Sequence, residues 1–353
     1  MIDNGPIVGL RVDVTARIGA GHAMRCLSIA QALNARRART IFFVSCDESA
    51  TFFQEEGFDS VVLGGDETDL TVDDAERLGS ALKGCGASSV LIDSYGVDGG
   101  FFDAVSDGAL GEVGIVYIDD LYTFAQGILD APIRRPVDAV VNFNIFADEK
   151  LYRLTYHGCT TQMMLGPRFA PLRSEFVKQR KAPYDGSVSD ILVTTGSTNP
   201  SCILERLSDI CLEATDDARV HVVVGPKAEF DDPLSDRVVT HRGESMADLM
   251  SLCQMAVAAA GVTLLELAAI GVPTLAVGIV ENQYQDIRVY EGMGLGLGCY
   301  ASDGDKEIAD KVSHLFDDGL LRTSFSRICC EAVDGKGADR IASAVLNLSK
   351  GER

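Results

Sequence analysis

A histidine follows two glycines near the start of the chain. Gly19, Gly21 and His22 come after a run typical of a β-strand, residues 7–14, and before the helical pattern of residues 23–37. Glycine lets a backbone approach a ligand closely, and the first N–H groups of a helix attract anions. Because an imidazole can exchange a proton near neutral pH, His22 is a candidate general base. The alternative is a capping or solvent-exposed histidine.

Other polar side chains could act with this histidine. Arg25 lies one helical turn after His22. Asp93 and Tyr95 follow a strongly apolar run, residues 88–92. An aspartate at the carboxyl end of a strand could orient the imidazole or bind a sugar hydroxyl, and a tyrosine there could close over a ligand. The alternatives are a surface or ion-paired arginine and ordinary turn residues, because Asp and Ser commonly begin turns.

A turn of small residues in the second half of the chain suits a diphosphate. Gly261, Val262 and Thr263 lead into a helix expected over residues 262–270, whose first N–H groups would point outward. Glu266, one turn further on, could accept hydrogen bonds from two ribose hydroxyls. The alternative is a capping box, since a threonine followed three residues later by a glutamate is its signature.

Two more polar turns follow strands of the second half. Asn282 and Gln283 come after an apolar run that ends at Val280. Their amides could bind phosphate or the polar groups of a sugar, and a helix N-cap is the alternative for Asn282. Gly196 lies in a small polar turn, residues 194–198, after another apolar strand.

The sequence favours neither a metal nor a bound cofactor. Asp119 and Asp120 follow the strand expected over residues 114–118 and could hold a divalent ion. Neighbouring residues of a regular strand point to opposite faces, however, so a turn or helix cap is the favoured interpretation. Met24 stands where a dinucleotide-binding G-x-G-x-x-G motif has its third glycine. The ten cysteines form no C-x-x-C or zinc-type spacing, which favours small buried side chains in a reducing cytosol.

Alternating strands and helices must position these groups. Continuous β-branched runs separated by amphipathic helices are typical of a parallel sheet covered on both faces. An irregular stretch, residues 147–186, joins the first half to a second half in which the alternation restarts. The sequence therefore predicts an α/β fold with two Rossmann-like domains, residues 1–180 and 181–353, facing each other across a cleft. The second domain would carry a helical tail.

The composition excludes two classes of protein. Among 353 residues, Lys and Arg number 31 and Asp and Glu 52, for a net charge of −21. A general nucleic-acid binder needs a basic surface to neutralise phosphates. No apolar run approaches the ~20 residues of a membrane span, and the first residues lack the basic head and apolar core of a signal peptide. We therefore expect a cytoplasmic protein without membrane insertion and without nucleic acid as a partner.

Taken together, these segments resemble a known enzyme family. The most specific are a G-x-G-H-x-x-R block from Gly19 to Arg25 and a Leu-Arg-x-Glu-Phe block over residues 172–176. They are similar to the UDP-2,4-diacetamido-2,4,6-trideoxy-β-L-altropyranose hydrolases of pseudaminic acid synthesis. The matching segments, which lie in the first 300 residues, are residues 11–13 with Asp13, 18–27, 92–96, 118–120, 142–144, 165–176, 260–266, 271–273 and 281–283.

The resemblance implies a GT-B-like fold and metal-independent hydrolysis of a UDP-sugar. It makes His22 the base that activates water to attack the anomeric carbon, after which UDP and a free di-N-acetylated trideoxy sugar are released. Tyr95 and Asn282 match residues at the sugar site, and residues 261–263 with Glu266 match the segment that holds UDP. The alternatives are a GT-B glycosyltransferase that uses an acceptor hydroxyl, and a UDP-sugar-binding protein without activity.

The predicted site thus has two sets of residues. The catalytic set is His22, Tyr95 and Asn282. The substrate-binding set is Asp13, Gly19, Gly21, Arg25, Asp93, Gly196, Gly261, Val262, Thr263, Glu266 and Gln283.

Overall fold

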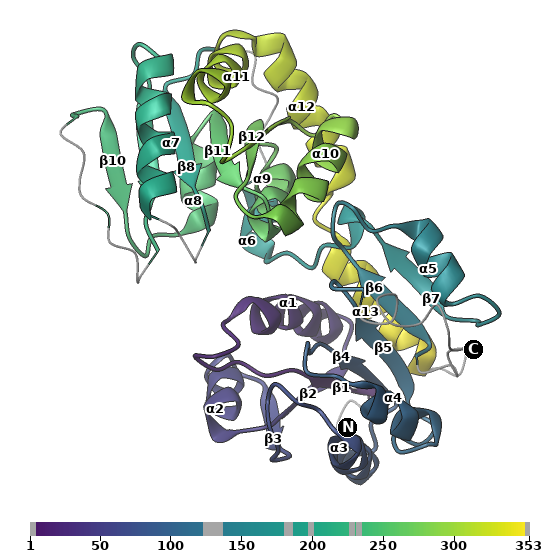
Figure 1. Ribbon diagram of the computed structural model, residues 1–353. Coiled ribbons are helices and arrows are strands. Elements are labelled where there is room, and N and C mark those ends of the chain that lie inside the picture. The colour runs from purple at the N-terminus through teal and green to yellow at the C-terminus, as the bar shows by residue number, and fades with distance from the viewer. Residues whose placement is uncertain are drawn as a thin grey trace. The chain divides into compact units, whose positions relative to one another are not determined.

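The computed structural model describes residues 5–122, 137–179, 186–196, 201–225, 230 and 235–349. The chain divides into two compact units, the first formed by Met1–Arg173 with Lys336–Arg353 and the second by Ser174–Gly335. Each unit contains one parallel sheet with helices around it (Figure 1). This confirms the predicted α/β fold class. The predicted boundary between residues 180 and 181 lies outside the described residues.

The first unit is built on a seven-stranded parallel sheet in the order β3-β2-β1-β4-β5-β6-β7. Its central strands are buried on both faces, as the continuous apolar runs predict. The strands are β1 Ile7–Arg11, β2 Arg39–Val44, β3 Asp59–Val62, β4 Ser89–Ile92, β5 Gly114–Ile118, β6 Ala139–Asn142 and β7 Gln162–Leu165.

Capping residues define several helices of this unit. Thr71 and Asp74 form a capping box at the start of α3, and Gly86 ends that helix in the left-handed conformation. Asp98 accepts a hydrogen bond from the Phe101 N–H at the start of α4. The helices are α1 Gly21–Ala35, α2 Asp47–Glu55, α3 Val72–Cys85, α4 Gly99–Ser106, α5 Glu149–Thr155, the 3₁₀-helix η1 Pro167–Phe169 and α13 Gly337–Ser349.

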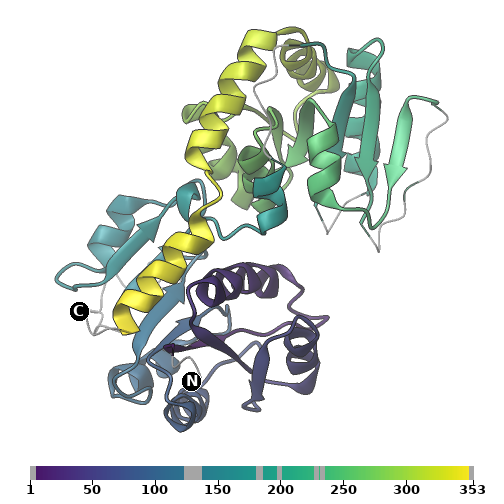
Figure 2. The ribbon, with the colours of Figure 1, turned by 180° about the vertical axis from the view of Figure 1, so that it is seen from behind.

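The last helix belongs to the first unit. Helix α13 packs against α1, β4 and β5, and Figure 2 shows it in yellow across one face of this sheet. Its apolar side, which includes the fully buried Ile341 and Val345, covers that face. From the sequence, this helix was predicted to belong to the second domain. A helix pattern does not reveal which sheet the helix will cover.

The second unit contains a six-stranded parallel sheet in the order β10-β9-β8-β11-β12-β13. One continuous core packs Val193, Val257 and Val277 of the central strands with Leu204 and Leu207 of α7. The strands are β8 Asp190–Thr194, β9 Arg219–Val223, β10 Val238–His241, β11 Met255–Ala259, β12 Thr274–Gly278 and β13 Leu297–Tyr300.

The helices of the second unit complete the layers around its sheet. They are α6 Ser174–Lys178, α7 Ser201–Ala214, α8 Met246–Leu252, α9 Val262–Ile270, the 3₁₀-helix η2 Glu281–Gln283, α10 Tyr284–Gly292, α11 Asp305–Asp317 and α12 Gly319–Ala332. Within the described ranges, no helix of either unit is long and apolar enough to cross a membrane.

A carboxyl group in α10 is held in an unfavourable environment. Asp286 is half-buried, and its Oδ1 atom accepts no hydrogen bond from any residue that the structure describes. Burial raises the pKa of Asp286 to about 7. Between about pH 4 and pH 7 the Asp286 carboxyl is therefore protonated in the folded state and ionised in the unfolded chain. The free energy of unfolding accordingly falls as the pH rises from about 4 towards 7.

Replacing Asp286 with Asn is therefore expected to stabilise the second unit at about pH 8. We expect a gain of about 1–2 kcal/mol after allowance for solvent screening and for the favourable position of an acid in the first helical turn. The gain should shrink at about pH 5. Urea unfolding of the full chain at both pH values measures it. Asp310→Asn, an exposed site on α11, changes the net charge equally and should give little change. A gain that does not depend on pH would contradict the explanation.

Candidate functional site

A cavity of about 300 Å³ lies in the first unit, within the loops that follow β1, β3 and β4. This is the edge at which parallel α/β sheets bind ligands. Its lining is Asp13, Arg17, Ile18, His22, Glu67, Thr68, Asp93, Ser94, Tyr95 and Gly96. Four of these are predicted site residues, and the other six were not predicted.

The predicted base lies on the wall of this cavity. Helix α1 begins at Gly21, two residues earlier than predicted, so His22 lies in its first turn and is buried. Asp93, directly after β4, contacts His22 Nδ1 through Oδ1 at 2.7 Å. Because a carboxylate can only accept, we assign the proton to Nδ1. Nε2 is then the basic nitrogen, and within the described residues it has no hydrogen-bond partner. This is how an aspartate orients an imidazole for proton transfer.

Tyr95 lies against the imidazole. The Tyr95 and His22 rings meet edge to face, with their centroids 4.3 Å apart. The Tyr95 hydroxyl donates a hydrogen bond of 2.9 Å to Asp120 Oδ2, while half of the residue remains exposed at the cavity. Burial and the neighbouring Asp120 raise the pKa of Tyr95 well above its ordinary value. The hydroxyl is therefore neutral near neutral pH and can donate a hydrogen bond.

Arg25 contacts protein carboxylates and does not line the cavity. Its Nε and Nη2 atoms donate to the two oxygens of Asp93, at 2.6 and 2.5 Å, and Nη1 donates to Asp120 at 2.7 Å. Burial alone would raise the pKa of Asp93, but the charge and hydrogen bonds of Arg25, with the His22 contact, hold it well below its ordinary value. The sequence predicted substrate binding for Arg25, whereas its geometry is that of a residue that holds Asp93.

The two adjacent aspartates after β5 have separate partners. Asp119 accepts a hydrogen bond of 3.1 Å from the buried Tyr152 hydroxyl, while Asp120 accepts from Arg25 and Tyr95. The described residues contain no group of three His, Cys, Asp or Glu side chains placed to hold a metal ion.

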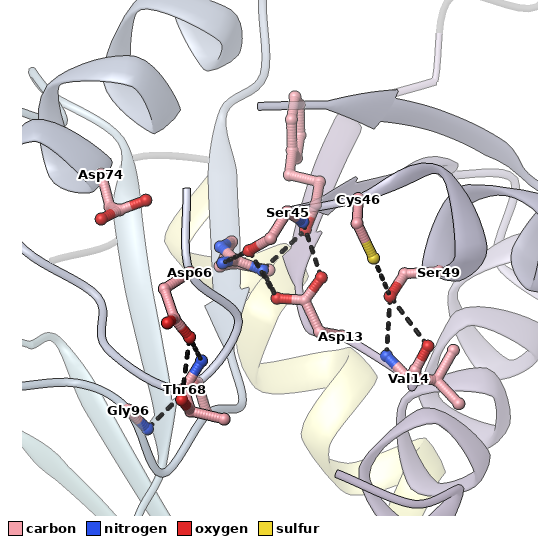
Figure 3. A network of polar contacts seen from close by, with 12 residues as sticks. Asp13, Val14, Ser45, Cys46, Ser49, Asp66, Thr68, Asp74 and Gly96 are labelled. Atoms are coloured by element: carbon pink, nitrogen blue, oxygen red, sulfur yellow. Dashed lines mark hydrogen bonds and ion pairs between the residues drawn. The ribbon is translucent and has the colours of Figure 1, made fainter. Parts of the chain in front are cut away.

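Asp13 is also held by protein groups. Its carboxylate accepts hydrogen bonds from the Ser45 N–H at 2.6 Å, from the Ser45 hydroxyl at 2.9 Å and from Arg11 Nη1 at 2.5 Å. Figure 3 shows Ser45 directed at Asp13, beside the contacts of Ser49 with Val14. Asp13 and Arg11 are both buried. Asp13 thus borders the cavity but fixes the loop after β1, whereas the sequence predicted that it binds substrate.

The rim of the cavity comes from a loop that the motifs did not indicate. Thr68, which donates to Asp66 Oδ1 in Figure 3, lies in the loop between β3 and α3. This loop passes directly over Gly96, where an added Cβ would lie 2.5 Å from the backbone of Thr68. Arg17, on the loop after β1, is largely exposed and lies 3.8 Å from Asp66. Gly96, one residue after Tyr95, is the feature of the sequence that could have indicated this close approach of the loop.

The two glycines before His22 shape the turn and do not line the cavity. Gly19 has φ 81, a conformation that other residues rarely adopt, and its N–H donates to Thr15 O at 2.8 Å. Gly21 is the first residue of α1.

The predicted diphosphate turn of the second unit has an uncapped helix start. Helix α9 begins at Val262 with Gly261 as its N-cap, and no side chain caps it. Thr263 is thus inside the helix, so the alternative of a Thr263–Glu266 capping box is wrong. Gly261 and Val262 are exposed, which leaves the first N–H groups of α9 open to an anion.

Gln283 has a structural role. Its amide donates to Ala260 O at 2.7 Å and accepts from the Ile279 N–H at 2.8 Å, so it ties the turn before α9 to the end of β12. The sequence predicted substrate binding. Asn282 lies in η2, but its side chain is outside the described residues, as are Ser197 and Thr198 after Gly196. Gly196 donates to Thr194 Oγ1 at 3.4 Å.

No family model matches the chain. An uncharacterised protein of Methanocaldococcus jannaschii is 23% identical over 293 residues, which cover 79% of this chain and 56% of that protein. The spore coat polysaccharide biosynthesis protein SpsG of Bacillus subtilis is 25% identical over 227 residues, 61% of this chain and 66% of SpsG. The pseudaminic acid cytidylyltransferase and UDP-2,4-diacetamido-2,4,6-trideoxy-β-L-altropyranose hydrolase of Helicobacter pylori is 24% identical over 252 residues, 71% of this chain. The match spans only 44% of the Helicobacter protein's length.

Solved structures show the same fold at lower identity. Acinetobacter baumannii MurG aligns with a TM-score of 0.68 and 14% identity, covering 97% of this chain and 99% of MurG. The glycotransferase of kitacinnamycin aligns with a TM-score of 0.70 and 15% identity, covering 98% of this chain and 99% of that one. The fold is therefore that of the GT-B glycosyltransferases.

Proposed function

We propose that this protein hydrolyses a UDP-sugar and that His22 activates the attacking water. The observation that carries the proposal is the Asp93–His22 pair on the wall of the cavity, with Nε2 of His22 as its basic nitrogen. The low-identity relationship to the Helicobacter hydrolase supports this choice of reaction, and that protein's name suggests a di-N-acetylated trideoxy sugar.

The proposed reaction is a displacement at the anomeric carbon. Nε2 of His22 takes a proton from water as the water oxygen bonds to that carbon, and the bond from the carbon to the phosphate oxygen breaks. UDP leaves with the electron pair of that bond, and the sugar leaves with a new hydroxyl. We propose that the uncapped start of α9, in the second unit, binds UDP through its free N–H groups.

The second candidate is transfer of the sugar to an acceptor hydroxyl. It is favoured by one finding, namely that solved structures with this fold include glycosyltransferases. The same Nε2 atom would then deprotonate the acceptor in place of water. Asp93 and Tyr95 would keep the roles that their geometry gives them.

Product analysis in ¹⁸O-labelled water separates these reactions. The purified full chain is incubated with a panel of UDP-linked di-N-acetylated deoxysugars and UDP-N-acetylglucosamine, and products are read by mass spectrometry. Hydrolysis predicts UDP together with a free sugar that carries one ¹⁸O, without any acceptor. Label in the nucleotide would overturn attack at carbon. Sugar transfer that occurs only with an added acceptor would favour the second candidate, and intact substrates throughout would reject both.

A further inference from the structure

We propose that Arg25 is a positioning residue that balances the charge of Asp93 beside His22 and so keeps the imidazole in its neutral, proton-accepting form. The inference rests on the proposed function, because it explains how the base of that reaction stays available. An ionised aspartate alone beside a histidine favours the imidazolium, which cannot act as a base.

The guanidinium is placed to cancel that charge at short range. Arg25 Nη2 lies 2.5 Å from Asp93 Oδ1 and 2.9 Å from His22 Nδ1, so the three groups meet at one point. With the proton assigned to Nδ1, His22 Nδ1 and Arg25 Nη2 both donate to Asp93 Oδ1. The two nitrogens are then neighbouring donors and do not form a hydrogen bond with each other. A positive charge this close opposes protonation of the imidazole, while the carboxylate favours it.

Burial makes this balance strong. The Asp93 side chain is fully buried, and those of Arg25 and His22 are exposed by only 11% and 9%. Water therefore screens the three groups poorly. The Cys26 thiol adds a neutral donor to Asp93 Oδ2 at 3.4 Å, and its pKa is raised by burial and by Asp93, so it brings no further charge.

The other polar groups around His22 do not replace Arg25. Asp120, after β5, is bonded to Arg25 and to the neutral Tyr95 hydroxyl. Asp13, on the loop after β1, is paired with the buried Arg11. The remaining charged groups of the cavity are Arg17, on the same loop, and Glu67, on the loop before α3. Of the charged groups that the structure describes here, only Arg25 bonds Asp93 and also contacts His22.

The first test follows the protonation of His22 directly, without substrate. Nitrogen-15 NMR of the full wild-type chain should show the imidazole proton of His22 on Nδ1, hydrogen-bonded to Asp93. A neutral ring with its proton on Nε2 would overturn the proposal. This measurement does not depend on turnover, so it holds even if no UDP-sugar is hydrolysed and the proposed function fails.

The second test compares Arg25→Gln with Arg25→Lys. In Arg25→Gln the charge of Asp93 is unbalanced, so the acidic limb of the kcat/KM profile and the NMR titration of His22 should both move up by about 1–2 pH units. Arg25→Lys keeps the charge and should restore much of the wild-type limb. Arg36→Gln removes an exposed arginine paired with Asp339 at the other end of α1, and should leave both profiles unchanged.

The outcomes separate positioning from general structural damage. A purely structural role would lower kcat/KM at every pH in Arg25→Gln and leave the limb in place, which would refute the charge balance. An Arg25→Lys profile equal to that of Arg25→Gln would also refute it. If Arg25→Gln does not fold, Arg25→Lys decides, because a limb shifted upward although the positive charge is kept would refute the charge balance.

Discussion

Alanine in place of His22 is expected to lower kcat by about 10²–10⁴-fold, the usual contribution of a positioned general base. The variant loses the nitrogen that accepts the proton, whereas the start of α9, which we propose binds UDP, lies in the other unit and is unchanged. Binding of UDP should therefore persist. Steady-state kinetics with the UDP-sugar that the wild type hydrolyses, together with calorimetric titration of UDP, measure the two effects separately.

An exposed histidine of the same unit provides the matched control. His157 follows α5 and does not line the cavity, so His157→Ala should retain wild-type turnover. If His22→Ala kept wild-type turnover, the base would have to be sought elsewhere. If it lost UDP binding as well, a general structural defect would explain the result better than the loss of a base.

Replacing Asp13 with Ala is expected to destabilise the first unit by about 3–5 kcal/mol. The change leaves the Arg11 guanidinium buried without its carboxylate and removes the acceptor of the Ser45 N–H and hydroxyl. An unpaired buried charge has a large desolvation cost that no other group in this network offsets. Urea unfolding of the full chain measures the loss.

An exposed aspartate–arginine pair of the same sheet shows what burial contributes. Asp59 and Arg39 lie 2.7 Å apart, as an ion pair with more than half of each side chain exposed. Asp59→Ala should cost about 0–1 kcal/mol, because water screens the pair and solvates the remaining arginine. Equal losses for Asp13→Ala and Asp59→Ala would show that the buried pair is not the source of the stability.

Local patterns in the sequence were sufficient to predict most of both sheets. Strand β5 and helix α9 lie at the predicted residues, because β-branched runs and 3.6-residue apolar spacing are local properties. Strands β7 and β13 were missed. Each is a short strand at the edge of its sheet, Gln162–Leu165 and Leu297–Tyr300, and its extended form depends on pairing with a neighbour.

The sequence also predicted that Asp93 could orient the imidazole of His22. They are 71 residues apart, but each follows a strand at its carboxyl end. Strands β1 and β4 are neighbours in the sheet, so the two side chains come within 2.7 Å. Parallel sheets bring such residues to one edge as a consequence of their topology.

Only the tertiary structure decided which partner each polar side chain takes. Arg25 contacts Asp93 and Asp120, Asp13 contacts Arg11 and Ser45, and Gln283 contacts backbone groups. A buried charged or amide group forms hydrogen bonds with whichever donors or acceptors lie within about 3 Å of it. That distance depends on the packing of elements far apart in the chain, so residue type and spacing predicted polar functions here but not their partners.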